Sequence, residues 1–275
     1  MNNTELTNAL APCIFERQDY SLHYWLGGPE GAPLIVFIHG SSMDHRMFLP
    51  QMKAVLGHFR VLLWDLPGHG KSRLRKKRWV FFLKEAVEDL KALLDELNCP
   101  KAVLIGHSLG ASISQEFIFL YPERVSGLVV LGGTCLTTKL SFQDAIKVRI
   151  RGLLIGLLPH SAQKKAIGEL AGVTPEVQHY TREAFSQVPK EVNKTLAKAL
   201  PGFFHDEPGY TIPCPFLLIH GEKDAVKRVR QQAPVWSKRE PTCEYAVIPG
   251  AGHNANQDNP EFFNKVLLRF LAKIG

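Results

Sequence analysis

The stretch Ala102-Val-Leu-Ile-Gly106-His-Ser108-Leu-Gly110 decides the fold. Its first four residues form a short unbroken apolar run, as expected of a parallel strand that helices cover on both faces. The next five match Gly-x-Ser-x-Gly, and Leu109 to Tyr121 fit a helix. A serine at such a junction projects from a tight turn toward a base, because the flanking glycines allow the turn. The amide of Leu109, at the helix start, points to where negative charge develops on an attacked carbonyl oxygen.

Other apolar runs repeat this strand pattern along the chain. They are Leu34 to Ile38, Val61 to Trp64, Leu128 to Leu131 and Phe216 to Ile219, with Tyr245 to Ile248 as a further candidate. The amphipathic segments Val80 to Leu97 and Pro260 to Lys273 predict surface helices. Strands that alternate with helices indicate an α/β fold with a mostly parallel sheet. Its ligand crevice is expected beyond the carboxyl ends of the strands.

Two regions depart from this alternation. Near the start, Ile14 to Gln18 and Leu22 to Leu26 predict an antiparallel hairpin. From Leu136 to Tyr210 no strand pattern occurs, whereas Phe142 to Leu158 and Pro189 to Leu200 fit helices. We expect this insertion to lie above the crevice as a lid that shapes the pocket and excludes water.

The composition is that of a globular protein. Of 275 residues, 45% are hydrophobic and 21% charged, which excludes disordered and collagen-like chains. The five cysteines are scattered and form no C-x-x-C pair, so neither a disulfide framework nor a zinc site is expected, and a cytoplasmic location fits best. No secretory signal is visible at the start, and the longest apolar stretch, Gly152 to Pro159, is too short to span a membrane.

The formal net charge is +7, and its one dense run is Arg73 to Arg78, RLRKKR. Like-charge runs are usually exposed loops, so a solvated loop is the preferred interpretation. The competing interpretation is a surface that meets nucleic acid or an anionic membrane. Nucleic-acid binding requires charge spread along a face with stacking aromatic residues or a known module. Neither is found, so we expect no nucleic-acid partner.

On its own, Gly-x-Ser-x-Gly also fits an ordinary glycine-bounded turn, but two further segments supply the partners of a serine nucleophile. His253 ends Gly250-Ala-Gly-His, a glycine-rich loop after the last predicted strand, and can reach over the sheet edge as a general base. Asp224 lies just after the predicted strand Phe216 to Ile219. It supplies a carboxylate that fixes the imidazole tautomer and stabilises the imidazolium. Glu222 is the competing acid, because either type serves in this chain order.

Five elements in this order resemble the α/β-hydrolase superfamily. They are His39-Gly40, Asp65-Leu-Pro-Gly-His-Gly-Lys-Ser72, Gly106 to Gly110, Gly221 to Asp224 and Gly250 to His253. The resemblance covers nearly the whole sequence. It implies an α/β-hydrolase fold with a mostly parallel, eight-stranded sheet, in which residues 1–135 and 211–275 form the core and residues 136–210 a helical cap.

The resemblance also assigns roles to single residues. In such proteins the residue after His-Gly contributes an oxyanion N–H, which carried over to this chain is Ser41, beside Leu109. The turn that contains Asp65, Gly68, His69 and Gly70 is structural in the family, so these residues are expected to be scaffold.

The resulting expectation is a hydrolase that cleaves a carboxylic ester, lactone or thioester through an acyl-enzyme, using Ser108, His253 and Asp224 and neither a metal nor an organic cofactor. Related dehalogenases and epoxide hydrolases place aspartate at the position of Ser108, which disfavours their reactions here. The alternative is a ligand receptor or signalling protein on the same fold with slow hydrolysis. The substrate is expected to be a small, partly hydrophobic acyl compound, and cleavage of an amide or a carbon–carbon bond stays open because such enzymes share the fold. The sequence makes no prediction of the oligomeric state.

Three further groups are candidates for the pocket or for packing around it. Residues after the oxyanion loop either line the pocket or are exposed: Ser42, Met43, His45 and Met47. His107 is expected to pack or hydrogen-bond beneath the serine turn. An apolar run in the insertion could contact an acyl group of the substrate, but apolar stripes usually pack in a core, which is the preferred interpretation. Its residues are Leu153, Leu154, Ile155, Leu157 and Leu158.

Overall fold

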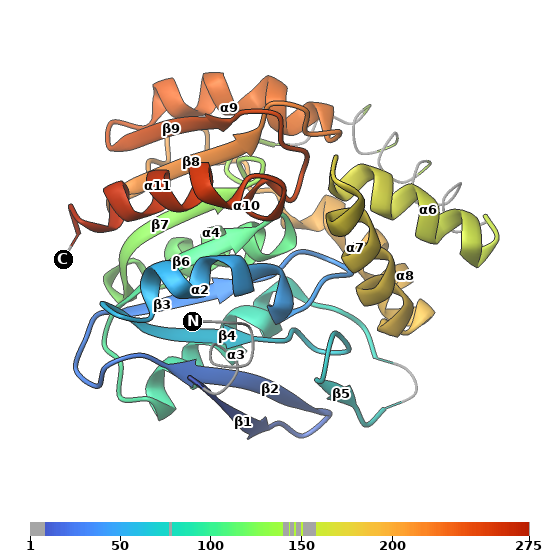
Figure 1. Ribbon diagram of the computed structural model, residues 1–275, viewed down its shortest axis with the longest axis horizontal. Coiled ribbons are helices and arrows are strands. Elements are labelled where there is room, and N and C mark those ends of the chain that lie inside the picture. Colours follow the sequence, from blue (N-terminus) through green and yellow to red (C-terminus); the bar gives the residue numbers. More distant parts are fainter. Residues whose placement is uncertain are drawn as a thin grey trace.

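The computed structural model describes residues 9–76, 79–139 and 158–274, together with positions 143, 146 and 150. In this part of the chain a nine-stranded sheet runs through the centre with helices on both faces (Figure 1). The strands are β1 (Leu10–Glu16), β2 (Tyr20–Gly27), β3 (Leu34–Ile38), β4 (Arg60–Trp64), β5 (Arg73–Leu74), β6 (Ala102–His107), β7 (Val125–Leu131), β8 (Phe216–Gly221) and β9 (Cys243–Ile248). The α-helices are α2 (Leu49–Val55), α3 (Leu83–Glu96), α4 (Leu109–Leu120), α6 (His160–Ala171), α7 (Pro175–Gln187), α8 (Lys190–Ala199), α9 (Lys227–Arg239), α10 (Ala255–Asp258) and α11 (Pro260–Leu271). Short 3-10 helices lie at η1 (His45–Phe48), η2 (Pro122–Arg124) and η3 (Leu200–Phe203).

The strand order is β1-β2-β4-β3-β6-β7-β8-β9. β1 pairs antiparallel with β2, and β2 pairs antiparallel with β4. From β4 to β9 all neighbours along this path are parallel. The predictions of an α/β fold, a mostly parallel sheet of eight strands on the main path and an initial hairpin are confirmed. The two-residue β5, paired with β2 off this path, was not predicted.

Helices cover the sheet on both faces, which explains the unbroken apolar strands. In β3, Leu34, Val36 and Ile38 join a core cluster with residues of α3, α4 and α9. The alternate residues Ile35 and Phe37 join a second cluster with residues of α2 and α11. Because successive side chains of a strand point to opposite faces, each parallel strand contributes to both cores.

The loops that carry the sequence motifs all follow the carboxyl ends of parallel strands. His39-Gly40 follows β3, the turn from Asp65 follows β4, and Ser108 follows β6. The loops with Asp224 and His253 follow β8 and β9. Parallel strands end at the same sheet edge, so these loops gather at one end of the molecule, as expected for an open α/β sheet.

Between β7 and β8 the described residues form helices and no strand, and α6, α7 and α8 lie together at one end of the sheet (Figure 1). The helix predicted at Pro189 to Leu200 is observed as α8. The helix predicted at Phe142 to Leu158 and most of the apolar run that starts at Leu153 lie outside the described residues. Among the described helices, none combines the length and the apolar character that a membrane span requires.

The described basic residues of the run are exposed, as predicted, and only Arg73–Leu74 departs from a loop, because these two residues form β5. Arg73 begins β5, and its guanidinium donates a 2.7 Å hydrogen bond to the carbonyl oxygen of Gly70. Arg75 forms an ion pair with Glu16, and Lys76 forms one with Asp19 at 2.5 Å. These contacts join the described part of the run to the first hairpin and to the turn before β5, whereas residues 77 and 78 lie outside the described chain.

Candidate active site

Ser108 occupies a strained turn between β6 and α4. Its backbone has φ 51° and ψ −107°, a conformation that non-glycine residues rarely adopt. The turn is tight because a Cβ at Gly106 or Gly110 would overlap the backbone of α4 or of Ile38. The Ser108 amide is anchored by a 2.9 Å hydrogen bond to the carbonyl oxygen of Leu131, and the side chain stays partly accessible. This is the geometry of a nucleophile elbow, which presents a serine hydroxyl above the sheet.

The structure brings His253 and Asp224 together. Nδ1 of His253 lies 3.0 and 2.9 Å from the two carboxylate oxygens of Asp224. Asp224 is completely buried, and its Oδ1 also accepts a 2.8 Å hydrogen bond from the amide of Val226. A carboxylate at Nδ1 requires that nitrogen to carry the proton, so Nε2 is left as the basic atom.

The His253 ring lies beside the serine turn. It lies 4.7 Å, centroid to centroid, from the ring of His107, the residue before Ser108. A Cβ built on Gly132 would lie 3.0 Å from Cε1 of His253, so this glycine makes room for the ring. Within the described chain no hydrogen bond joins Nε2 of His253 to the hydroxyl of Ser108. Such bonds often tighten only once substrate is bound.

Glu222, the competing acid, lies elsewhere. Its side chain is exposed, and its Oε2 accepts a 2.8 Å hydrogen bond from the amide of Gly250. It therefore supports the start of the loop that carries His253 without touching the ring. Of the two carboxylates that the sequence left open, the structure places Asp224 against the imidazole.

The two predicted oxyanion amides belong to backbone segments that approach the serine. A Cβ at Gly40 would lie 3.3 Å from Cβ of Ser108, so the chain just before Ser41 passes directly beside the nucleophile. Leu109 is the first residue of α4. Within the described chain, neither the Ser41 amide nor the Leu109 amide donates a hydrogen bond to a protein acceptor. Neither amide is therefore committed to a partner within the described chain.

The loop after Ser41 is held by the helices of the insertion. Oγ of Ser42, a residue with φ 64°, donates a 2.9 Å hydrogen bond to Oδ1 of Asn193 in α8. The hydroxyl of Tyr180 in α7 accepts from the amide of Asp44 at 3.2 Å and donates to its carbonyl oxygen at 3.1 Å. No local pattern predicts these contacts, because their partners lie 136 and 151 positions apart in the chain.

The pocket candidates after Ser41 are not exposed. Ser42, Met43 and Met47 are buried. His45 is also occupied: its ring stacks on Trp25 with centroids 3.5 Å apart, and its Nδ1 lies 2.9 Å from Asp65 Oδ1. His45 therefore supports the turn after β4, and the interpretation of this group as exposed loop residues is wrong.

The turn after β4 behaves as scaffold. Oδ2 of Asp65 accepts from the amide of Lys71 at 2.7 Å. Burial alone would raise the pKa of Asp65, but the hydrogen bond and charge interaction with His45, followed by His39 and the Lys71 amide, outweigh it and lower the pKa. His39 connects this turn to the loop after β3, since its Nε2 accepts from the amide of Leu66 at 2.9 Å.

Three buried histidines, His39, His69 and His107, lie at or just after the carboxyl ends of β3, β4 and β6. Burial lowers the pKa of His39, that of His69 to about 3, and that of His107 well below its usual value. His107 packs beneath the serine turn as predicted, and its Nε2 donates to the carbonyl oxygen of His253 at 3.2 Å. These rings stay neutral at physiological pH and act as fixed packing and hydrogen-bonding groups.

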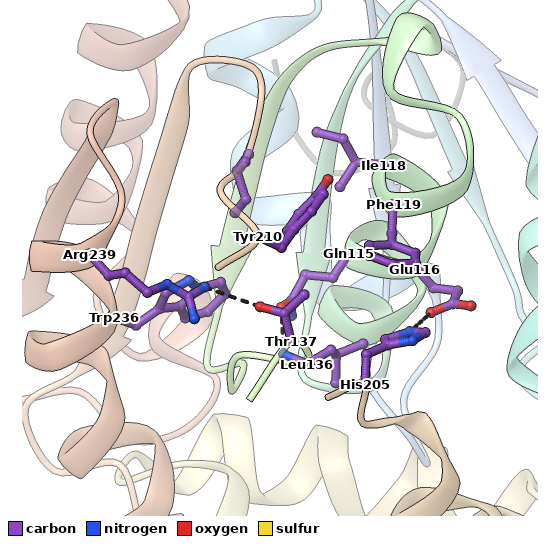
Figure 2. Close-up of a pocket in the computed structure, with 11 residues that line it drawn as sticks. Gln115, Glu116, Ile118, Phe119, Leu136, Thr137, His205, Tyr210, Trp236 and Arg239 are labelled. Carbon is purple, nitrogen blue, oxygen red and sulfur yellow. Dashed lines mark hydrogen bonds and ion pairs between the residues drawn. The ribbon is translucent and has the colours of Figure 1, made fainter. Parts of the chain in front are cut away.

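A small cavity lies away from these residues, between α4, α9 and the chain that leads to β8 (Figure 2). Its free volume is about 10 Å³, room for about one water molecule. One wall is the pair of Glu116 and His205, which lie 2.5 Å apart. Arg239 closes another side and donates to Thr137 at 3.1 Å. No candidate active-site residue lines this cavity, so it is separate from the chemistry.

All five cysteines are free. Among the described residues no group of three or more His, Cys, Asp or Glu side chains could hold a metal ion.

The geometry can be compared with known proteins. A family profile described as "Alpha/beta hydrolase family" matches residues 35–266. The chain is 29% identical over 259 residues to the dihydrolipoyllysine-residue acetyltransferase component of the acetoin cleaving system of Pseudomonas putida. The aligned segment covers 90% of this chain but only 65% of that protein. The chain is also 24% identical over 265 residues to 3-oxoadipate enol-lactonase 1 of Acinetobacter baylyi, in an alignment that covers 95% of this chain and 97% of the lactonase.

The fold resembles that of a solved thermophilic esterase from Thermogutta terrifontis, with a TM-score of 0.80 and 22% identity over 96% of this chain and 99% of that one. Because the family profile covers most of the sequence, the chain belongs to the alpha/beta hydrolase family. It is an α/β-fold hydrolase.

Proposed function

We propose that this protein hydrolyses a carboxylic ester, lactone or thioester through an acyl-enzyme formed on Ser108. The observation that carries the proposal is the contact of His253 Nδ1 with the buried carboxylate of Asp224, at 2.9 Å, beside the strained serine turn. A base oriented by a carboxylate next to a turn-borne serine is the arrangement that activates a hydroxyl for acyl transfer. The named esterase and enol-lactonase relatives support this class of reaction.

In the proposed first step, Oγ of Ser108 attacks the carbonyl carbon of the substrate while Nε2 of His253 takes the hydroxyl proton. The negative charge that develops on the carbonyl oxygen is stabilised by the amides of Ser41 and Leu109. Collapse of this intermediate breaks the bond to the alcohol or thiol. The leaving group departs with the proton from His253, and the acyl group remains on Ser108.

Water completes the cycle by the same route. His253 takes a proton from the water, the resulting hydroxide attacks the acyl carbon, and Ser108 leaves with the proton returned by the imidazolium. Asp224 keeps the imidazole in one tautomer and stabilises its charged form throughout. The proposed steps use only protein groups and water, with neither a metal nor an organic cofactor.

We propose further that residues 136–210 form a cap over a core of residues 1–135 and 211–275. The contacts of Tyr180 with Asp44 and of Asn193 with Ser42 support this division, because they attach α7 and α8 to the loop that follows Ser41. A cap in this place would exclude water and bound the acyl pocket. A small, partly hydrophobic acyl substrate fits such a pocket.

The test is turnover of p-nitrophenyl esters of increasing acyl length by the wild type and Ser108→Ala. Ser112→Ala, which removes a hydroxyl one turn further along α4, is the matched control. A fluorophosphonate probe reports the reactivity of Ser108 independently of the substrate. We expect turnover and labelling in the wild type and the control, and neither in Ser108→Ala.

Two other outcomes are informative. Turnover that survives Ser108→Ala contradicts the proposal. Labelling at Ser108 with negligible turnover on every ester, lactone and thioester tested would favour a receptor that keeps a reactive serine, and a pull-down would then search for its partner.

A further inference from the structure

The loop that carries His253 is fastened to the connection between α6 and α7, within the insertion. The amide of Asn254, just after His253, donates a 2.6 Å hydrogen bond to the carbonyl oxygen of Ala171 at the end of α6. The amide of Gly252, just before His253, donates at 2.8 Å to Oδ2 of Asp258. Both peptide N–H groups that flank the proposed base are therefore held by groups outside the loop itself.

Asp258 extends this contact into the insertion. Its Oδ1 accepts from the amide of Thr174 at 3.0 Å and from the Thr174 hydroxyl at 2.9 Å, and its Oδ2 accepts from the amide of Val173 at 3.1 Å. The single carboxylate of Asp258 thus accepts hydrogen bonds both from residues 173–174 and from Gly252. All of these donors are backbone amides or a hydroxyl, which only a carboxylate with two accepting oxygens can satisfy together.

The backbones on the two sides approach closely at this point. A Cβ built on Gly252 would lie 3.2 Å from Cα of Gly172 and 3.3 Å from the carbonyl oxygen of Ala171. A Cβ on Gly172 would in turn lie 3.2 Å from Oδ1 of Asp258. Glycine on both sides lets the insertion reach the loop, so the contact is a packed junction.

Helix capping does not account for the position of Asp258. The next helix, α11, is capped by Asn259, whose side chain accepts from the amide of Phe262 at 3.2 Å. Asp258 ends the short α10, and its side chain accepts hydrogen bonds from the insertion. Its hydrogen bonds serve the junction between residues 172–174 and the loop of His253.

We propose that Asp258 is a positioning residue for His253, and that through it the α6–α7 connection fixes where the imidazole stands relative to Ser108. This inference rests on the proposed function of the Ser108 site. Within the described chain, the carboxylate of Asp258 makes no hydrogen bond to the side chains of Ser108, His253 or Asp224. It acts by holding Gly252, so the loop keeps the imidazole both against Asp224 and within reach of the serine.

The experiment compares Asp258→Asn with the matched control Glu222→Gln. Both changes convert a carboxylate that accepts an amide of the same loop into an amide, but Glu222 is exposed and makes no contact with residues 172–174. Asp258→Asn turns one accepting oxygen into a donor that faces other donors. We expect kcat to fall about 10- to 100-fold with KM changed less than about threefold, since misplacing a catalytic group costs rate more than binding.

A second readout separates positioning from general loss of structure. The rate of fluorophosphonate labelling at Ser108 should fall with kcat, and the acid limb of the pH profile of kcat/KM should move, because the His253–Asp224 contact is loosened. Asp258→Glu, which restores two accepting oxygens, should recover part of the rate. Melting temperatures of all variants show that each is folded at the assay temperature.

A double-mutant cycle with Thr174→Val tests whether the effect passes through the insertion. Removing the Thr174 hydroxyl deletes one donor to Asp258. The loss in kcat of the double variant should therefore differ clearly from the combined losses of the two single variants. Purely additive losses, an unchanged kcat in folded Asp258→Asn, or an equal loss in Glu222→Gln would each overturn the inference. Retention of activity in Ser108→Ala would instead refute the proposed function, so the two failures are distinguishable.

Discussion

Replacing Asp224 by asparagine tests the carboxylate at His253 with almost no change in shape. Oδ1 of Asp224 accepts from the amide of Val226 at 2.8 Å, so the variant should keep its amide oxygen there. The new NH₂ group would then face Nδ1 of His253, at the place where a carboxylate oxygen now lies 2.9 Å away. A donor in that place requires Nδ1 to accept, so the ring proton moves to Nε2, the atom that must take the proton from Ser108.

The expected magnitude follows from this tautomer change. An imidazole held in the wrong tautomer loses about 10⁴-fold in kcat in triads of this kind. That factor corresponds to about 5 kcal/mol of transition-state stabilisation. Binding of substrate does not need the base, so we expect KM to change little in comparison.

The assay is ester turnover under substrate saturation, with fluorophosphonate labelling of Ser108 as a second measure. Glu222→Gln is the control, because it alters a nearby carboxylate that does not contact His253, and it should stay close to the wild type. A folded Asp224→Asn protein that keeps more than about one tenth of wild-type kcat would refute the reasoning. So would a larger loss in the control.

Three further predictions follow from single contacts. Tyr180→Phe leaves the amide of Asp44 without its acceptor, so the free energy of unfolding measured in urea should fall by about 1–3 kcal/mol, and a fall within error would contradict this contact. Gly132→Ala places a Cβ 3.0 Å from Cε1 of His253 at φ 59°, so kcat should fall about tenfold or more, and a normal kcat in the folded variant would show that the ring is not confined there. Burial lowers the pKa of His69 to about 3, so the unfolded chain binds a proton below about pH 6.5 that the folded chain does not, and stability is lost as pH falls through that range. Comparing the wild type with His69→Gln, the drop in unfolding free energy from pH 7 to pH 5 should be about 2 kcal/mol smaller in the variant, and equal drops would contradict the assignment.

The central strands could be predicted because burial on both faces leaves a clear pattern. Leu34–Ile38 was predicted with its observed bounds, since every side chain of β3 is buried. The first strand was placed too late, at Ile14 to Gln18, whereas β1 spans Leu10–Glu16. It lies at the edge of the sheet and is mostly exposed, so backbone pairing with β2 determines its bounds more than hydrophobicity does.

Elements with little apolar pattern were missed. The two residues of β5 form a strand only because they pair with Tyr20 and Ser21 of β2. Helix α9 is rich in Lys and Arg, contains Pro234, and buries few of its side chains, so neither propensity nor periodicity marks it.

The candidate site likewise contains residues that could be predicted from the sequence and residues that could not. Ser108, Asp224 and His253 could be proposed because each lies in a short glycine-containing motif directly after a strand. Asp258 and Tyr180 could not, because their importance depends on partners about 84 and 136 positions away, and no local pattern reports such contacts.

The central claim is that an acyl group is transferred to Ser108, and the most direct measurement is mass spectrometry of the acid-quenched protein during turnover. A p-nitrophenyl ester is mixed with the wild type, quenched at early times and digested, and the peptide that contains Ser108 is compared with that of Ser108→Ala. We expect a mass increase equal to the acyl group on the wild-type peptide, at the hydroxyl of Ser108, that disappears as substrate is exhausted. Turnover by the wild type with no adduct on Ser108 at any quench time, or an adduct on another residue, would contradict the account.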